Sequence, residues 1–207
     1  MSQRARVAVL DYGIGNLRSA QKALERVGAD AVLTSDASVA ETADAVVLPG
    51  VGAFGACMSA LRDAGLEHVA RDAVASGVPF LGICVGMQML FDRSDEDPTA
   101  RGLGIIPGTV TWIPQSVPRP QMQWNQLNLV TDDPLFAGLG QSPWMYFVHS
   151  LHGVPTDSSH VAATVHYGDT LNVAFRRDNV FATQFHPEKS ASAGLALLEN
   201  FVASVAP

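Results

Sequence analysis

The residues PFLGICVGMQ, at positions 79–88, decide how the chain is expected to fold. The first half is a short apolar run typical of a strand buried on both faces, and the second half begins an apolar, helix-compatible segment that runs through Phe91. Cys84 lies at the junction, with Gly82 and Gly86 two residues to either side. This pattern is typical of a nucleophile elbow with cysteine in place of serine. A core cysteine between two packing glycines explains these residues equally well.

A reactive Cys84 would need groups that favour its thiolate, and the N–H groups at the start of the following helix are one such source. A proton acceptor is offered by TQFHPE, at positions 183–188. Pro187 forbids a helix there and favours an extended His186. His186 and Glu188 are then expected to project to the same side, because side chains two residues apart do so in extended chain. Cys84, His186 and Glu188 are therefore predicted to form a nucleophile–base–orienter triad.

The composition favours one α/β domain over residues 1–207, large enough for a substantial core. Hydrophobic residues make up 47% of the chain and charged residues 16%, which suits a sheet buried on both faces or a large apolar surface for a partner. The net charge of −7, without a lysine or arginine cluster, argues against non-specific nucleic-acid binding. We expect no membrane span and no signal peptide, because no apolar run is long enough and the amino terminus leads directly into a strand.

The two cysteines, Cys57 and Cys84, exclude a disulfide framework and have no partners at metal-ligand spacing. A free reactive thiol predicts a cytoplasmic protein, and Cys57 is expected to be a small buried residue. His149 and His152 are three residues apart, but no third ligand is evident for a metal. We therefore expect a strand followed by a substrate-contacting turn at these histidines, and neither a metal nor a cofactor.

The first half of the chain alternates short apolar runs with helical spacing, which predicts a parallel sheet with helices on both faces. The expected strands are residues 6–10, 31–33, 45–48 and the start of 79–88, and the expected helices are residues 17–27, 37–42 and 66–76.

A glycine loop, DYGIGN at positions 11–16, follows the first strand. A dinucleotide-binding fingerprint is one interpretation, but Arg18 stands where its third glycine should be, and no acidic residue clearly ends a second strand at the right distance. A tight turn near the carboxyl edge of the sheet, where the active sites of such sheets lie, is favoured instead.

A second glycine loop, PGVGAFG at positions 49–55, follows the third strand. The backbone N–H of Val51 or Gly52 could hold a developing oxyanion together with that of Val85, directly after Cys84. An ordinary flexible loop is the alternative, but an acyl-transfer nucleophile needs such donors.

The second half changes to short strands separated by proline and glycine turns, which predicts antiparallel additions to the sheet. It begins with an acidic, solvated loop at 92–98 and ends with a closing helix at 195–205. The expected strands between them are residues 109–113, 126–130, 145–148, 162–167, 171–175 and 180–184.

The proline-rich stretch 118–125 is expected to be an exposed loop. Trp124 lies there close to Met122 and Arg119, a composition typical of an interface anchor. A tryptophan folded back on its own core is equally compatible with composition alone.

These residues together resemble the class I glutamine amidotransferases, and within them the glutaminase subunits of imidazole glycerol phosphate synthase. The resemblance covers nearly the whole chain. The elbow at 82–88 and the block at 184–190 occur across the superfamily, whereas the first signature at 11–19, the segment 48–54 and YFVHS at 146–150 narrow it to histidine biosynthesis.

The resemblance implies a flavodoxin-like three-layer sandwich with a mostly parallel central sheet and antiparallel additions in its second half. It implies that Cys84 attacks the side-chain amide of glutamine, that His186 transfers protons and that Glu188 orients His186. A cysteinyl thioester is then hydrolysed to glutamate. The implied contacts to glutamine are Gln88, Glu96 and the backbone of Ser150 and Leu151.

The partner that the resemblance implies is a separate (β/α)8-barrel cyclase subunit in a heterodimer. It would receive shielded ammonia and make imidazole glycerol phosphate and aminoimidazole carboxamide ribotide. Without this partner the chain is expected to be nearly inactive, until the peptide around Val51 reorients. The expected partner surface comprises Asn16, Arg18, Met122, Trp124 and His149.

The sequence departs from the family pattern at four positions: Gln121 stands for a histidine, Gln123 for a glycine, Leu151 for a tyrosine and Val85 for a leucine. None of these replacements removes a catalytic group. Three rival functions are disfavoured by particular residues. A glutaminase for another pathway, such as anthranilate or pyridoxal phosphate synthesis, is disfavoured by the first signature and by residues 146–150. A degenerate binding module is disfavoured because Cys84, His186 and Glu188 are all present, and a cysteine hydrolase or chaperone of a related small α/β fold is disfavoured by Gln88 and the PGVG loop.

Overall fold

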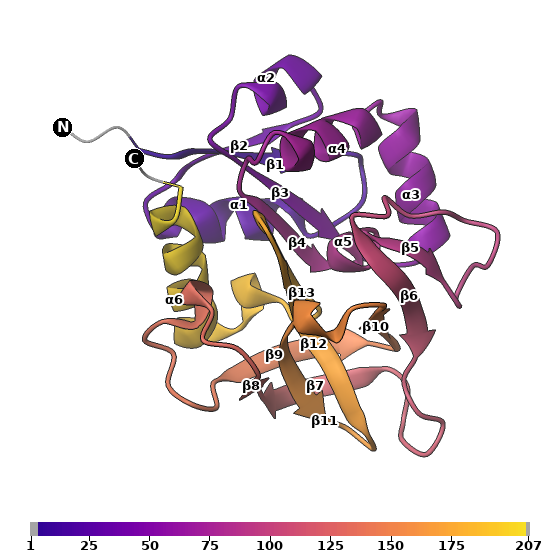
Figure 1. Ribbon diagram of the computed structural model, residues 1–207. Helices are drawn as coiled ribbons and strands as arrows, with labels where there is room; N and C mark the ends of the chain where they lie inside the picture. The colour runs from indigo at the N-terminus through magenta and orange to yellow at the C-terminus, as the bar shows by residue number, and fades with distance from the viewer. Residues whose placement is uncertain (1–3, 206–207) are drawn as a thin grey trace.

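The computed structural model describes residues 4–205 and is built around an eight-stranded sheet (Figure 1). Its first five strands are parallel, and the last three are antiparallel to their neighbours. In spatial order these strands are β2 (Asp30–Thr34), β1 (Arg6–Leu10), β3 (Ala45–Gly50), β4 (Phe80–Cys84), β13 (Val180–Thr183), β12 (Thr170–Arg177), β11 (Val161–His166) and β8 (Asn128–Leu129).

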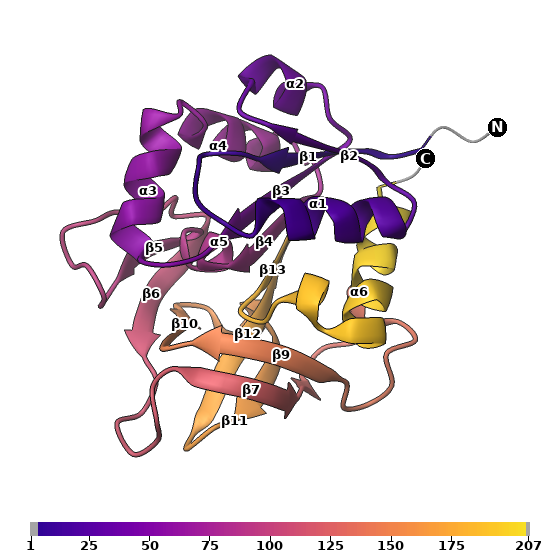
Figure 2. The same cartoon turned by 180° about the vertical axis from the view of Figure 1, so that it is seen from behind.

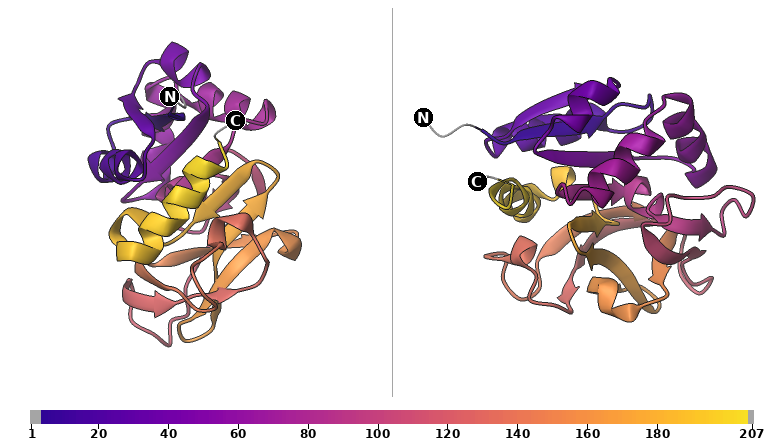
Figure 3. Two further views of the ribbon diagram at one scale, coloured as in Figure 1. Left: turned by 90° about the vertical axis from the view of Figure 1, so that its left-hand side faces the viewer. Right: turned by 45° about the horizontal axis from the view of Figure 1, so that its top comes forward.

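Helices cover both faces of the parallel strands and make the three layers visible in Figures 2 and 3. Helices α1 and α6 share one face, and α2 and α4 pack together on the other. This division is the one that right-handed crossovers between parallel strands require. The helices are α1 (Leu17–Arg26), α2 (Ala37–Glu41), α3 (Phe54–Asp63), α4 (Glu67–Ala75), α5 (Val85–Gln88) and α6 (Ala191–Ala203), with 3-10 turns η1 (Pro134–Phe136), η2 (Ser158–His160) and η3 (Pro187–Lys189).

Strands β3 and β4 are buried along their whole length, as the continuous apolar runs predict for a sheet covered on both faces. The α/β fold with a mostly parallel sheet is thus confirmed. Within residues 4–205, no helix combines the length and the apolar character needed to cross a membrane.

The prediction that all the later strands extend the central sheet is wrong in part. Strands β12, β11 and β8 are antiparallel additions to it, whereas β13, also predicted as antiparallel, joins it parallel to β4, and five strands form two smaller sheets. One contains β5 (Phe91–Ser94), β6 (Ile106–Trp112) and β10 (Leu151–Pro155), and the other pairs β7 (Gln121–Gln126) with β9 (Trp144–His149).

The elbow helix ends at Gln88 and does not continue through Phe91, which begins strand β5. A short apolar run does not by itself distinguish a buried helix from a buried strand. Here the Phe91 ring packs edge-on against Phe175, with ring centroids 5.2 Å apart, and this distant contact favours the extended chain. The acidic stretch that follows is also not simply solvated, because Ser94 is buried and Asp92 accepts a hydrogen bond from the Gly108 N–H at 2.7 Å.

The stretch 118–125, predicted as a loop, contains most of strand β7. The predicted strand 126–130 divides between β7 and β8, and strand β10 replaces the turn expected after His149. In each case pairing with a distant strand supplies the backbone hydrogen bonds that the local sequence does not announce. Helix α6 begins at Ala191 rather than at residue 195 and ends at Ala203.

Candidate active site

Cys84 occupies a sharp elbow between β4 and α5. Its backbone has φ +55° and ψ −113°, a left-handed conformation that is rare and strained for a residue with a Cβ. The turn also leaves no room for a side chain at Gly86, where a Cβ would lie 1.8 Å from the carbonyl oxygen of Leu48. Cys84 and Gly86 thus have the sharp strand-to-helix geometry that the nucleophile-elbow interpretation predicts.

His186 and Glu188 form a buried hydrogen-bonded pair beside the elbow. His186 Nδ1 lies 2.8 Å from Glu188 Oε1, and their side chains are only 5% and 2% exposed. The predicted contact is present and His186 is extended as predicted, but the chain does not stay extended beyond it. The chain turns into η3 at Pro187, so the 3-10 turn and not an extended strand brings Glu188 under the ring.

The charge state of His186 follows from this pairing. Burial by itself would lower the pKa of His186, but hydrogen bonding and charge interactions with Cys84 and Glu188 outweigh it and raise that pKa to about 10. The second carboxylate oxygen of Glu188, Oε2, is buried and has no hydrogen-bond donor among residues 4–205. The His186 imidazolium, bonded to Oε1, is therefore the group that compensates the buried charge of the Glu188 carboxylate. A protonated His186 next to Cys84 favours the thiolate, which is the nucleophilic form.

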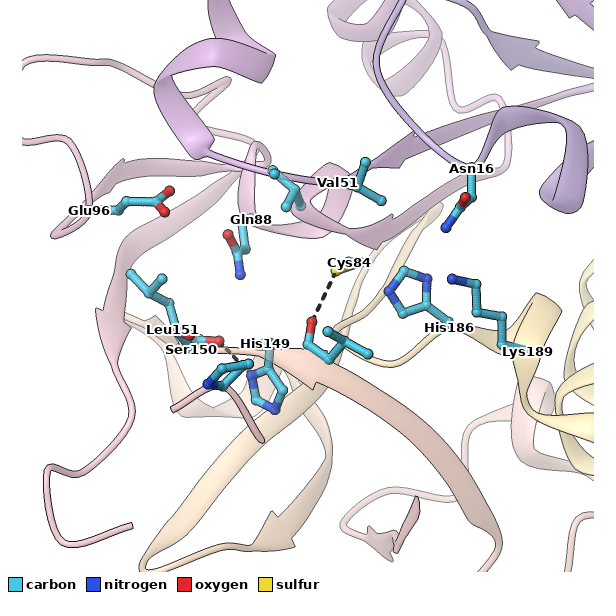
Figure 4. Close-up of a pocket in the computed structure, with 14 residues that line it drawn as sticks. Asn16, Val51, Cys84, Gln88, Glu96, His149, Ser150, Leu151, His186 and Lys189 are labelled. Atoms are coloured by element: carbon cyan, nitrogen blue, oxygen red, sulfur yellow. Dashed lines mark hydrogen bonds between the residues drawn. The ribbon is translucent and has the colours of Figure 1, made fainter. Parts of the chain in front are cut away.

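Two further groups approach the Cys84 sulfur. The Cys84 thiol donates to the carbonyl oxygen of Val148 at 4.0 Å, the contact dashed in Figure 4. The amide nitrogen of Gln184 lies 3.7 Å from Sγ. Gln184 was not among the predicted site residues, although its position at the end of a buried strand, two residues before His186, was a usable signal.

The predicted oxyanion residues Val51, Gly52 and Val85 all line the cavity around Cys84. Val85 is the first residue of α5, where an N–H group has no acceptor within the helix. Cys57 is buried as predicted, and its thiol also donates to the carbonyl oxygen of Val51 at 3.2 Å. Because C=O and N–H point in opposite directions in a trans peptide, this bond turns the Gly52 N–H away from Cys57.

The cavity has a volume of about 390 Å³ and collects most of the predicted site residues (Figure 4). Figure 4 shows His186 on one side of Cys84 and Gln88 on the other, with Glu96 beyond Gln88. Glu96 also accepts a hydrogen bond from the Phe54 N–H at 2.7 Å, which ties the acidic stretch to the start of α3. The other predicted residues in the lining are Asn16, His149, Ser150 and Leu151, and Lys189 and Pro120 join them.

No group of three or more histidine, cysteine, aspartate or glutamate side chains in residues 4–205 is arranged to hold a metal ion.

His149, expected on the partner surface, is only 5% exposed, and its ring is held inside the protein. Its Nδ1 lies 2.7 Å from the carbonyl oxygen of Leu151, and its Nε2 lies 2.7 Å from the side-chain oxygen Oε1 of Gln121. The expectation of a surface His149 is therefore wrong, because the alternation along β9 turns this side chain inward.

Burial lowers the pKa of His149 to about 4, although the bond to the Leu151 carbonyl partly opposes this effect. The neutral ring that donates from Nδ1 needs a donor at Nε2. Exchanging the positions of the Gln121 amide oxygen and nitrogen supplies it, and the NH2 group has no other partner among residues 4–205. In that orientation the Gln121 side chain satisfies a neutral His149.

We expect this buried histidine to make the fold sensitive to acid. Above pH 6.5 His149 is neutral in both the folded and unfolded chains, whereas between pH 6.5 and about 4 only the unfolded chain takes up the proton. Its contribution to the free energy of unfolding should fall by about 3 kcal/mol over that range. Urea unfolding of the wild type and of His149→Gln at several pH values would measure it. An identical pH dependence in both proteins would contradict the assignment.

The outward face of the β7–β9 pair carries an apolar patch, defined here as Met122, Trp124, Trp144, Tyr146 and Val148. Met122 is 62% exposed and Trp124 43%, so Trp124 is not folded into the core. The Trp124 and Tyr146 rings lie against each other, with centroids 5.8 Å apart. Because Val148 also lines the cavity, the patch reaches the mouth of the site.

Comparison with known proteins gives one consistent answer. The family described as "Glutamine amidotransferase class-I" matches residues 8–205. The imidazole glycerol phosphate synthase subunit HisH of Salinibacter ruber is 48% identical over 202 residues, covering 94% of this chain and 93% of that protein. The protein of the same name from Synechococcus elongatus is 49% identical, covering 100% of this chain and 96% of that protein.

Solved structures agree at the level of the fold. A structure described as a glutamine amidotransferase has a TM-score of 0.76 at 24% identity, covering 97% of this chain and 98% of that one. The structure of PurLQS from Thermotoga maritima has a TM-score of 0.74 at 19% identity, covering 98% and 99%. At such identities these likenesses concern the arrangement of the strands and helices.

Proposed function

Because the chain belongs to the class I glutamine amidotransferases, and within them to the HisH subunits of imidazole glycerol phosphate synthase, we propose that it hydrolyses glutamine to glutamate and ammonia for histidine biosynthesis. The observation that carries this proposal is the strained Cys84 elbow, which lines the same cavity as His186, the hydrogen-bond partner of Glu188.

In the proposed reaction the Cys84 thiolate attacks the side-chain amide carbon of glutamine. The tetrahedral intermediate places its negative oxygen against the N–H groups of Val85 and of the Val51–Gly52 segment. His186 donates its proton to the leaving ammonia as the thioester forms. The now neutral His186 takes a proton from water, which hydrolyses the thioester to glutamate and regenerates Cys84. Glu188 holds the ring in position through both steps.

The residues proposed to bind the glutamine head group include Gln88 and Glu96, which lie on the side of Cys84 opposite His186 (Figure 4). Gln88 and the backbone of Ser150 and Leu151 would bind its polar ends, and Glu96 would attract its α-amino group. All four residues line the same cavity as Cys84, which supports this division of roles. Their polarity suits a charged amino acid, whose ends must be hydrogen-bonded once they leave water.

The proposed partner is the (β/α)8-barrel cyclase subunit, which would use the ammonia to make imidazole glycerol phosphate and aminoimidazole carboxamide ribotide. The apolar patch on β7–β9 is the proposed docking surface, together with Asn16 and Arg18. Its exposed Trp124 and Met122 and its continuity with the cavity mouth support this choice, because a partner seated there would cover the exit for ammonia.

The proposal is tested by measuring glutamate formation by the purified chain alone, with the cyclase subunit, and with the cyclase plus its ribonucleotide substrate. We expect strong activity only in the third condition. Activity that the cyclase does not change would assign the glutaminase to another partner, and inactivity in every condition would favour a binding module.

Substitution Trp124→Ala is expected to weaken the complex with the cyclase by about 30-fold, because a central exposed tryptophan typically contributes about 2 kcal/mol to an interface. The matched control is Val130→Ala, which removes a 53% exposed hydrophobic side chain after β8, outside the patch. Calorimetric titration would give both dissociation constants. Equal affinities of the two variants would mean that the partner docks elsewhere.

A further inference from the structure

Gln184 is a buried polar residue that the proposed reaction does not yet use. It directly follows β13, whose parallel register with β4 places Thr183 opposite Ile83, so the next residues, Gln184 and Cys84, lie side by side. The backbone N–H of Gln184 donates to the carbonyl oxygen of Val173 at 2.8 Å. The residue is fully buried, with 0% of its surface exposed.

Both ends of the Gln184 side chain are engaged. Gln88 Nε2 donates to Gln184 Oε1 at 3.0 Å, and Gln184 Nε2 lies 3.7 Å from Cys84 Sγ. With Gln88 Nε2 as the donor, Gln184 Oε1 faces Gln88 and the Gln184 NH2 group faces the sulfur. The reversed amide would set its carbonyl oxygen against a thiolate, which is repulsive, and would leave the Gln88 donor facing another NH2 group.

We propose that Gln184 is a further catalytic residue, whose amide N–H donates a hydrogen bond to the Cys84 thiolate and whose orientation is set by Gln88. A hydrogen bond to a charged acceptor is stronger than one to a neutral acceptor, so this contact favours the thiolate over the thiol. Burying the Gln184 amide costs free energy unless all its polar groups are hydrogen-bonded, whereas an apolar side chain of the same size would avoid that cost. The amide is therefore expected to have a function at this position. The arrangement also links Gln88, a proposed glutamine contact, to the nucleophile through one side chain.

The test is the pH dependence of Cys84 alkylation by iodoacetamide in the full-length chain, with the modified cysteine located by peptide mass spectrometry. Only the thiolate displaces iodide, so the midpoint of the rate profile reports the thiolate population. Gln184→Met keeps the size of the side chain but loses the donor, and Gln184→Glu places a carboxylate against the sulfur. We expect midpoints about one unit higher for the methionine variant and higher still for the glutamate variant.

Gln88→Met serves as a second variant if the substitutions at Gln184 prevent folding, which circular dichroism would detect. It frees the Gln184 amide to rotate and is expected to raise the midpoint in the same direction by a smaller amount. Midpoints equal to that of the wild type in folded variants at both positions would overturn the role of Gln184.

This inference rests on the proposed role of Cys84 as nucleophile, but its failure is distinguishable from the failure of that role. A wild-type midpoint close to that of a free cysteine, about 8.5, would contradict the activated nucleophile itself. A low wild-type midpoint that the variants leave unchanged would contradict only the contribution of Gln184.

Discussion

Replacement of Cys84 by alanine is expected to lower glutamine hydrolysis by the activated complex by at least about 10⁴-fold, because no other group can form the thioester. Alanine keeps the Cβ at the strained elbow, so the fold should be retained and circular dichroism should not change. Glutamate formation in the presence of the cyclase and its substrate would measure the loss.

The comparison for this variant is Cys57→Ala, the same chemical change at the other cysteine. It removes the thiol that donates to the Val51 carbonyl, so a loss of about fivefold is expected, corresponding to one ordinary hydrogen bond. If the Cys84 variant lost no more activity than the Cys57 variant, Cys84 would not be the nucleophile.

Replacement of His186 by asparagine is expected to cost about 10³-fold or more in kcat, because one side chain both stabilises the thiolate and carries protons in both half-reactions. The raised pKa means that His186 keeps its proton through neutral pH and loses it only as the pH rises toward 10. The variant should therefore also require a higher pH for alkylation of Cys84. Both readouts can be measured on the same preparation.

The control is His166→Asn, which changes an exposed histidine at the end of β11. This variant should keep both the rate and the alkylation profile of the wild type. A His186 variant with an unchanged alkylation profile would show that the imidazolium does not activate Cys84.

The parts of the fold that the sequence predicted depend on short-range signals. Windows of about ten residues are enough to predict the buried strand, the tight turn between the glycines around Cys84 and the repeated strand–helix units. The parts that it missed depend on distant pairing. Strand β7 exists because β9 pairs with it, and Phe91 is extended because Phe175 packs against its ring.

The features of the candidate site also separate into those predicted by nearby residues and those that depend on distant contacts. The elbow geometry at Cys84 and the contact between His186 and Glu188 were predictable because the glycines and Pro187 lie in the local sequence, although the 3-10 turn at Pro187 was not foreseen. The inward turn of His149 toward Gln121, and the contact between Gln184 and Cys84, join residues 28 and 100 positions apart. Such contacts emerge only when the register of the strands is known.

The most direct measurement of the central claim uses glutamine labelled with ¹⁵N in its side-chain amide, supplied to the complete complex in an excess of unlabelled ammonium. If ammonia released at Cys84 passes to the docked cyclase without mixing with solvent, the label should be retained in the imidazole glycerol phosphate. A product that carries the isotope ratio of the surrounding ammonium would contradict delivery from this site.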